Sequence, residues 1–264
     1  MKPDSIVQEL EQRLPEIARE IIKKNTQLPE ENRERFHQDP DSVEENKPNW
    51  HQWGIITHSK KFREIYDTEI ADYLKIDSLE KEIDSIPKKE LIRISIPLHD
   101  LGKFQKTIKG EKSDFSNHER KSQEIILNSD LLKEYGLTNR QIEYIARCAG
   151  NHYQLGFVRS IAKRSDLKYT LRFVKDPAFA RTIKHYLPKF KGFEPEIGLL
   201  FLADSLAKTD IIIPAETDAE IQQYTAQVEQ EIQRRKLNPN LIYAIKQRPV
   251  NIAVGKEYLR KLEK

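Results

Sequence analysis

Cysteine is almost missing from this sequence, since Cys148 is the only one among 264 residues. A single cysteine cannot form an intramolecular disulfide, and it has no second thiol with which to make a zinc site or a redox pair. We expect it to be a small buried residue. Glycine is also scarce, with 9 residues, whereas 33% of the residues are charged. This mixture favours helices with solvated outer faces over a strand-rich fold.

Long hydrophobic runs are missing too. No segment approaches the ~18–20 apolar residues of a membrane span. The first residues, MKPDSIVQELEQR, carry charges where a signal peptide needs an apolar stretch. We therefore expect a soluble, cytoplasmic protein in a reducing setting, with no membrane partner.

The formal net charge of +3 is unevenly distributed. Residues 1–50 hold 8 Lys/Arg and 12 Asp/Glu, whereas residues 155–192 hold 10 Lys/Arg and 2 Asp. A charge run is usually a solvated helix face, but a stretch this basic also fits an anion-binding surface. Six aromatic residues, from Phe157 to Phe190, are interleaved with these charges. They fit either a helical core or a surface that stacks bases.

Apolar periodicity predicts an all-α fold. We expect a helix over residues 4–24, in which Pro15 starts a second short helix, and an irregular connection over 26–50. Helices should recur from about Trp53 to Thr209, with capping boxes at 116–119 and 138–141. Further helices are expected at 218–235, 240–247 and 254–262. The only strand-like run is Ile211–Pro214.

Six polar residues share helical faces with apolar residues, and they lie on five separate predicted helices. Two are carboxylates, which rarely become buried unpaired. One or two metal ions would neutralise and satisfy such a set together; the alternative is a series of separate His–Asp hydrogen bonds. The set is His58, His99, Asp100, His118, His152 and Asp204. The other histidines, His37, His51 and His185, lack this pattern, and we expect them on the surface or in loops.

The ordered set H…HD…H…H…D resembles the HD superfamily of metal-dependent phosphohydrolases. The segments LHDLGK, FSNHERKS, IARCAGNHY and LFLADSLAK carry the resemblance, which covers about residues 50–210. It implies three parts: an N-terminal helical extension and connection (1–45), an HD-domain helical bundle with the metal site (46–213) and a C-terminal helical extension (214–264).

The resemblance also implies the role of each ligand. His58, His99, Asp100 and Asp204 would hold a first divalent metal ion, and His118, His152 and a bridging Asp100 a second; the metals would be Mn, Fe, Mg or Ni. Two such ions ~3.5–4 Å apart would supply a bridging hydroxide that cleaves a phosphoester. Lys103 would contact a substrate phosphate, and Gly102 would let the backbone pass close to the site.

Several cations are candidates for binding a phosphorylated substrate, either a nucleotide or a single-stranded nucleic acid. Besides Lys103 they are Arg120, Lys121, Arg147 and Arg159, although each also fits a surface charge. An HD-type nuclease, similar to CRISPR-associated or exonuclease-linked HD domains, is one alternative. A di-iron oxygenase of the HD fold is another, and a non-catalytic HD domain a third. The first helix could mediate a homodimer or dock on the protein's own core.

Overall fold

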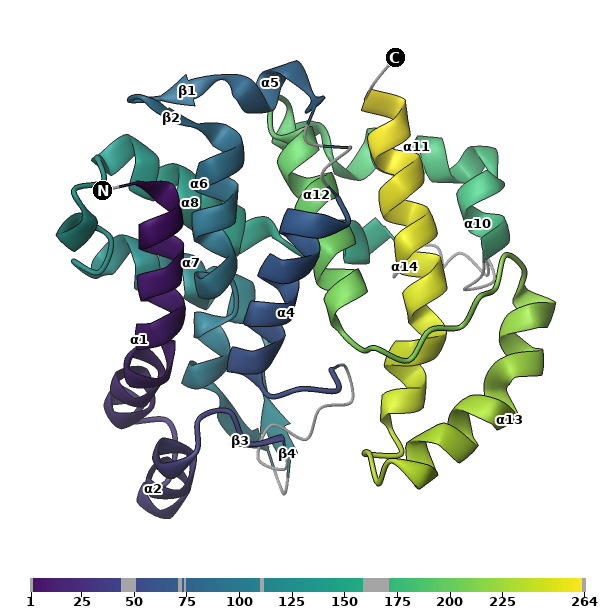
Figure 1. Ribbon diagram of the computed structural model, residues 1–264, viewed down its shortest axis with the longest axis horizontal. Coiled ribbons are helices and arrows are strands. Elements are labelled where there is room, and N and C mark those ends of the chain that lie inside the picture. Colours follow the sequence, from purple (N-terminus) through teal and green to yellow (C-terminus); the bar gives the residue numbers. More distant parts are fainter. Residues whose placement is uncertain are drawn as a thin grey trace. The chain divides into compact units, whose positions relative to one another are not determined.

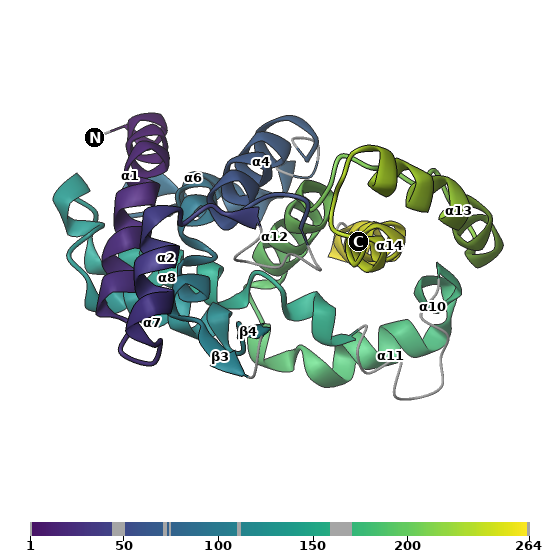
Figure 2. The same ribbon diagram turned by 90° about the horizontal axis from the view of Figure 1, so that it is seen from below.

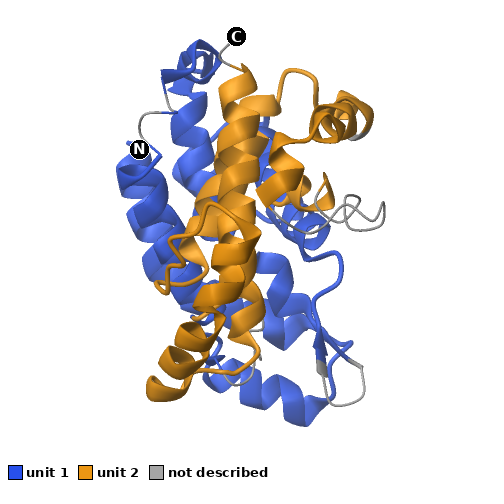
Figure 3. Cartoon of the chain, turned by 90° about the vertical axis from the view of Figure 1, so that its right-hand side faces the viewer, with its two compact units in different colours: residues 1–47, 53–152 blue, residues 48–52, 153–264 orange. Residues whose placement is uncertain are grey.

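A computed structural model gives the fold of the chain, and it describes residues 2–43, 51–70, 73, 75–109, 112–158 and 171–262. The described residues form helices and two small antiparallel hairpins, which confirms the all-α prediction (Figure 1). By its internal contacts the chain divides into two compact units (Figure 3). Unit 1 comprises residues 1–47 and 53–152, and unit 2 comprises residues 48–52 and 153–264. The domain boundaries that the motif implies stay a prediction.

Unit 1 carries five of the six predicted ligands. Its elements are α1 (Pro3–Lys24), α2 (Glu30–Gln38), α4 (Ile55–Thr68), α5 (Asp77–Glu80), β1 (Glu82–Ile83), β2 (Ile86–Pro87), α6 (Lys88–Ser95), the 3-10 helices η2 (Ile96–Leu98) and η3 (Leu101–Gln105), β3 (Thr107–Lys109), β4 (Lys112–Asp114), α7 (His118–Asn128), η4 (Lys133–Tyr135) and α8 (Asn139–Asn151). Helix α1 packs against α2, α6, η2 and η3, while α7 packs against η3 and α8 (Figures 1 and 2). The short η2 and η3 therefore lie inside a shell of longer helices.

Helix α1 runs unbroken through Pro15, so the prediction of a second helix starting there was wrong. A proline inside a helix costs roughly 3 kcal/mol. Full burial of an aliphatic side chain stabilises the fold by about 1.5–3 kcal/mol, and one face of α1 buries Ile6, Val7, Leu10, Leu14, Ala18 and Ile22. Burial along the whole face therefore outweighs the local cost of the proline.

The connection predicted as irregular over residues 26–50 contains helix α2, which is a second correction. Pro29 precedes the helix, and Glu30 and Glu31 occupy its first turn, where negative charge is favourable. Phe36 is its one buried residue. The ammonium of Lys106 lies 3.4 Å from the centre of the Phe36 ring. Packing against the residues that follow η3 thus holds α2, although its sequence has little apolar periodicity.

The strands also differ from the prediction. Ile211–Ile213 forms no strand; instead Ile211 and Ile213 bury their side chains against α13 (Asp218–Arg234) and α14 (Leu241–Leu262). The two hairpins lie elsewhere, where β1 pairs with β2 and β3 with β4. The turn of the first hairpin places Asp84 and Ser85 at positive φ, as a tight two-residue turn requires. Such short strands carry too few residues for a periodic signal.

The two predicted capping boxes have different outcomes. Thr138 caps α8 in a complete capping box with Gln141, as predicted. Helix α7 starts at His118, close to the predicted position, but its N-cap is Asn117 in the left-handed region without a side-chain cap. The box at Ser116 was therefore wrong, because the Ser116 hydroxyl bonds to Asp114 instead.

Unit 2 is built around its last helix. Its elements are α10 (Leu171–Lys175), α11 (Pro177–Tyr186), the 3-10 helix η5 (Pro188–Phe190), α12 (Glu194–Ala207), α13 and α14. Helix α14 packs against α10, α12 and α13, and it continues through Pro249, so the two separate helices predicted at 240–247 and 254–262 were wrong. Pro249 is itself buried, and packing of α14 on three helices offsets the bond that the proline cannot make.

Burial and helix length bear on two further features. Cys148 is buried, as expected. Among the described residues, no helix combines the length and the apolar character needed to cross a membrane.

Candidate metal centre

The His99–Asp100 pair lies in the turn between η2 and η3. Helix α6 ends at Ser95, just before Pro97, whose ring nitrogen cannot donate to the carbonyl of Arg93. The chain tightens there into 3-10 geometry just before the pair. Both side chains of the pair are buried, with 0% of His99 and 1% of Asp100 exposed. An ionised carboxylate at that depth requires partners.

Gly102 brings the start of α7 to this turn. Its N–H donates to the Ser122 hydroxyl over 2.8 Å. A Cβ atom added at Gly102 would lie 2.0 Å from the carbonyl oxygen of His118, far inside van der Waals contact. The expectation that this glycine permits a close backbone approach is confirmed, and the approach places His118 beside the pair.

Three of the histidines are oriented in the same way. Each ring places Nδ1 against the carbonyl oxygen of the residue three positions earlier: His99 at 2.7 Å from Ile96, His118 at 3.2 Å from Phe115 and His152 at 2.8 Å from Ala149. A carbonyl oxygen only accepts, so a neutral ring donates from Nδ1 and keeps its lone pair on Nε2. This is the arrangement in which a backbone carbonyl fixes a metal-binding histidine.

The three Nε2 atoms face the carboxylate of Asp100, and they divide between its two oxygens. Oδ2 lies 3.2 Å from Nε2 of His99. Oδ1 lies 3.4 Å from Nε2 of His118 and 3.9 Å from that of His152. Within the described part of the chain, Oδ1 of Asp100 and Nε2 of His99 are buried and make no hydrogen bond. Asp100 thus has the disposition of a carboxylate that bridges two groups of imidazoles.

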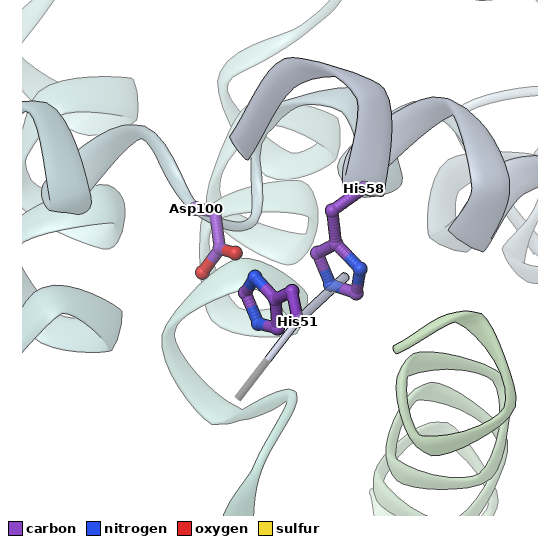
Figure 4. Close-up of side chains that lie close together, drawn as sticks. All are labelled: His51, His58 and Asp100. Atoms are coloured by element: carbon purple, nitrogen blue, oxygen red, sulfur yellow. The ribbon is translucent and has the colours of Figure 1, made fainter. Parts of the chain in front are cut away.

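His58 adds a fourth imidazole from α4. Its side chain is buried, and its ring centre lies 5.4 Å from that of His99 in an edge-on arrangement. Figure 4 shows His58 and Asp100 close together. His51, also labelled there, belongs to unit 2. It lies outside any helix or strand and is buried, so the loop assignment holds but a surface position for it was wrong. His37 and His185 are exposed, as expected.

The electrostatic environment of the cluster shifts the pKa values of Asp100 and His118. Burial by itself would raise the pKa of Asp100, but the charges of His99 and Lys103 outweigh it and hold that pKa well below its usual value. The ammonium of Lys103 lies 2.6 Å from Oδ2. Burial, reinforced by Lys103, lowers the pKa of His118 to about 4. At neutral pH the site therefore presents a carboxylate next to an uncharged His118.

This cluster could hold a metal ion. The ligand atoms of His99, Asp100 and His152 all lie within 4.8 Å of one another, and all three residues are buried. Imidazole nitrogen together with carboxylate oxygen is a ligand set suited to divalent transition metals. The orphaned Oδ1 and Nε2 atoms are the ones that such an ion would satisfy, so the residues fit the group that the sequence implies.

Asp204 lies in unit 2, on α12, where it is buried. Its carboxylate pairs with the ammonium of Lys208 over 3.0 Å, and that ammonium also lies 4.2 Å from the centre of the Tyr153 ring. The assignment of Asp204 as a metal ligand stays a prediction.

The cations proposed for substrate binding occupy different positions. Lys103 is beside Asp100, whereas Lys121 donates to the carbonyl of Gln105 over 2.7 Å. Arg120 is exposed and pairs with Glu124, and Arg147 is exposed. Arg159 lies outside the described residues. Only Lys103, of the described cations in this set, has an ammonium placed at a ligand.

Sequence reasoning missed two kinds of supporting residue. The backbone carbonyls that orient the rings lie three residues before each histidine, and this spacing is available in any sequence. Lys208 lies one helical turn after Asp204, a spacing at which side chains on a helix meet, so the sequence alone could have indicated it.

A scan of protein-family models gives no match to this chain, and a search of curated proteins finds no significant relative. The resemblance to the HD superfamily therefore rests on the motif residues themselves. The cluster in unit 1 adds a geometric observation, namely that five of the six motif residues lie in one buried neighbourhood.

Proposed function

We propose that this protein is a metal-dependent phosphohydrolase of the HD type. The observation that carries the proposal is the arrangement around Asp100, whose two carboxylate oxygens face different imidazoles. His99 lies at Oδ2, and His118 and His152 lie at Oδ1. This division supports a centre in which Asp100 is shared between two metal ions. His58 and Asp204 complete the proposed set.

Each residue of the proposed site would have a distinct task in this reaction. Bound divalent ions, of which Mn, Fe, Mg or Ni fit the ligands, would activate water and neutralise charge on the phosphoryl group. Backbone carbonyls would hold the Nδ1 atoms of His99, His118 and His152, so that their Nε2 atoms face the metal ions. Asp100 would stay ionised at neutral pH, since Lys103 and His99 lower its pKa.

Lys103 would bind the substrate. Its side chain is 12% exposed and its ammonium lies at the carboxylate, so it sits at the edge of the buried cluster rather than inside it. A cation there can stabilise the charge that develops on phosphoryl oxygens. We assign it the role of contacting the substrate phosphate.

The substrate class follows from a basic face in unit 2. Residues 171–192 hold 6 Lys/Arg and 1 Asp, and the cations Arg172, Lys175, Arg181, Lys184, Lys189 and Lys191 are exposed. Among the described residues, only Arg172 of these makes an ion pair, a long one of 4.0 Å to Asp218. Exposed Arg and Lys elsewhere commonly pair within one helix, as Arg234 does with Glu231. Exposed cations gathered in one stretch of sequence, with so few ion pairs among the described residues, favour a polyanion such as a nucleic acid strand.

The aromatic residues of this stretch argue for contacts with the phosphate backbone. Phe173, Phe179 and Phe190 are buried and cannot stack on bases. Phe157 is 58% exposed, while Tyr169 lies outside the described residues. The basic face therefore favours binding through phosphates, with little dependence on base identity. This supports the nuclease form of the phosphohydrolase more than a nucleotidase.

Hydrolysis of nitrophenyl phosphate mono- and diesters with added Mn²⁺ tests the reaction, with Asp100→Ala as the blank. Metal-dependent cleavage that disappears in this variant is expected, and preference for the diester would support a nuclease. An Asp100→Ala variant that keeps its activity would mean that the site is misassigned. Wild-type protein that binds iron, cleaves neither ester and shows a mixed-valence signal would overturn the proposal in favour of an oxygenase.

Binding of a labelled single strand tests the basic face separately. The double variant Arg181→Glu/Lys184→Glu should weaken binding and reduce the slope of log K against log salt by about 0.7 for each lost contact. Lys23→Glu/Lys24→Glu, at the exposed end of α1, provides a matched charge change in unit 1. Equal weakening by both double variants would refute a specific role for the face.

A further inference from the structure

The start of α4 has a feature that the metal-site motif does not explain. Helix α4 carries His58 in its first turn, and the N-cap residue is Gly54, which has no side chain to offer. The first N–H groups of a helix have no partner within the helix and need an acceptor. In α4, these donors include the amides of Ile56 and Thr57, immediately before the ligand.

Asp41 supplies the missing acceptor from a distant part of the chain. Its Oδ1 accepts from the amide of Ile56 over 2.7 Å and from that of Thr57 over 3.0 Å. Its Oδ2 accepts from the hydroxyl of Thr57. These are the second and third helical positions, which an N-cap side chain normally satisfies. A carboxylate at this end also suits the helix dipole.

The absence of a side chain at Gly54 leaves room for this contact. A Cβ atom added there would lie 1.9 Å from the backbone oxygen of Asp41 and 2.2 Å from Oδ1. Any side chain at residue 54 would therefore displace the carboxylate. The usual N-cap residues are excluded at the position where Asp41 takes over their task.

The segment that carries Asp41 is itself anchored in unit 1. Arg19 of α1 donates to the carbonyl of His37 at the end of α2, and Phe36 is buried beside the Lys106 ammonium. Asn25 donates to the backbone oxygen of Lys106 over 2.8 Å. Lys106 directly follows η3, which begins one residue after Asp100. The N-terminal helices thus tie the Asp41 turn to the same region that holds the central ligand.

We propose that Asp41 is a positioning residue for His58, so that the N-terminal segment forms part of the metal centre. The inference rests on the proposed metal-dependent function. The amide of His58 bonds to the carbonyl oxygen of the N-cap residue, Gly54, over 2.8 Å. If Asp41 is removed, the turn that bears the imidazole loses its external restraint, and the His58 ring is no longer held against His99.

Co²⁺ binding to the purified full chain tests this role, by calorimetry and by the visible absorption of the bound ion. Asp41→Ala should raise the Co²⁺ dissociation constant about 10–100-fold, as changes behind a ligand typically do, and should shift the absorption bands. Asp41→Asn keeps an amide oxygen for the two N–H groups, so it should recover most of the affinity. Asp176→Ala is the matched control, because Asp176 caps α11 by accepting from Ala178 over 2.7 Å.

The outcomes separate this inference from the proposed function. Wild-type protein that binds no Co²⁺ would overturn both. Wild-type protein that binds Co²⁺, with the same affinity and spectrum in Asp41→Ala, would overturn the role of Asp41 alone. If Asp41→Ala does not fold, Thr57→Val removes only the hydroxyl bond and should shift affinity in the same direction by less; an unchanged constant would then refute the inference.

Discussion

Replacement of Gly102 by alanine tests how the buried His/Asp cluster is assembled. The added methyl would lie 2.0 Å from the carbonyl oxygen of His118 and 2.8 Å from Cβ of Lys121. Both contacts involve α7, and the first is with backbone, which cannot rotate away. The turn after Asp100 and the start of α7 must therefore move apart by more than an ångström, and His118 must move with them.

The cost has two parts. Overpacking of a tight contact typically costs about 1–3 kcal/mol. Separation also lengthens the bond from the Gly102 amide to the Ser122 hydroxyl, and a buried donor left without a partner costs about 1–3 kcal/mol. Together these lower the free energy of unfolding by roughly 2–6 kcal/mol, which corresponds to a fall in Tm of roughly 5–20 °C.

Thermal unfolding and Mn²⁺ binding, measured on the same samples, distinguish the cost of overpacking from the cost of the lost hydrogen bond. Ser122→Ala removes the hydrogen bond without adding volume, so it should lose stability but keep most of its metal affinity. Gly136→Ala places a methyl at a position with φ of +76° and nothing within 4 Å, so it reports the cost of backbone strain alone. A Gly102→Ala protein as stable as wild type, with unchanged Mn²⁺ affinity, would refute the close-approach argument.

Four other outcomes are expected. Lys103→Ala should lower kcat/KM for a nitrophenyl phosphate about 100-fold without changing metal stoichiometry, because a cation aimed at developing charge is lost; an unchanged rate would remove Lys103 from the mechanism. Asp67→Asn should cost roughly 1–3 kcal/mol in urea unfolding, since both oxygens of Asp67 bind the Arg93 guanidinium, at 2.7 and 3.0 Å; no change would show that the pair is energetically neutral. Gly198→Val should cost about 1–3 kcal/mol, because even a Cβ would lie 2.6 Å from Leu259, and a neutral result would contradict tight packing of α12 on α14. Saturating metal at 100 times its Kd should stabilise the wild type by about 2.7 kcal/mol, an effect that a chelator reverses and that a protein without the site would lack.

The sequence was sufficient to predict the helical class and to predict that five of the proposed ligands lie near one another. Shared helical faces singled out His58, His99, Asp100, His118 and His152, and the structure gathers these five in unit 1. The reasoning worked because each lies near apolar residues that must be buried. A polar residue on the same helical face is buried together with them. When the helices pack around one core, these polar residues therefore lie close together.

Prolines, weak periodicity and contacts between separate segments account for most of the errors in the sequence-based prediction. Pro15 and Pro249 both lie inside continuous helices. Burial along each helix outweighs the local free-energy cost of the proline, and a short sequence window does not include that burial. Helix α2 has one buried residue, so its periodicity is too weak to detect. The hydrogen bond from the Ile56 amide to the Asp41 carboxylate joins two segments 15 residues apart, and no local sequence pattern predicts such a contact.

The orientation of the rings follows a rule that facial periodicity does not contain. His99 and His152 directly follow η2 and α8, and His118 begins α7. The carbonyls of Ile96 and Phe115 each lie against both the backbone N–H and the Nδ1 atom of the histidine three residues later, which the two lone pairs of a carbonyl oxygen allow. At these three element ends the backbone fixes Nδ1 and aims Nε2, whereas His58 lies within a helix whose first amides bind Asp41 of another segment.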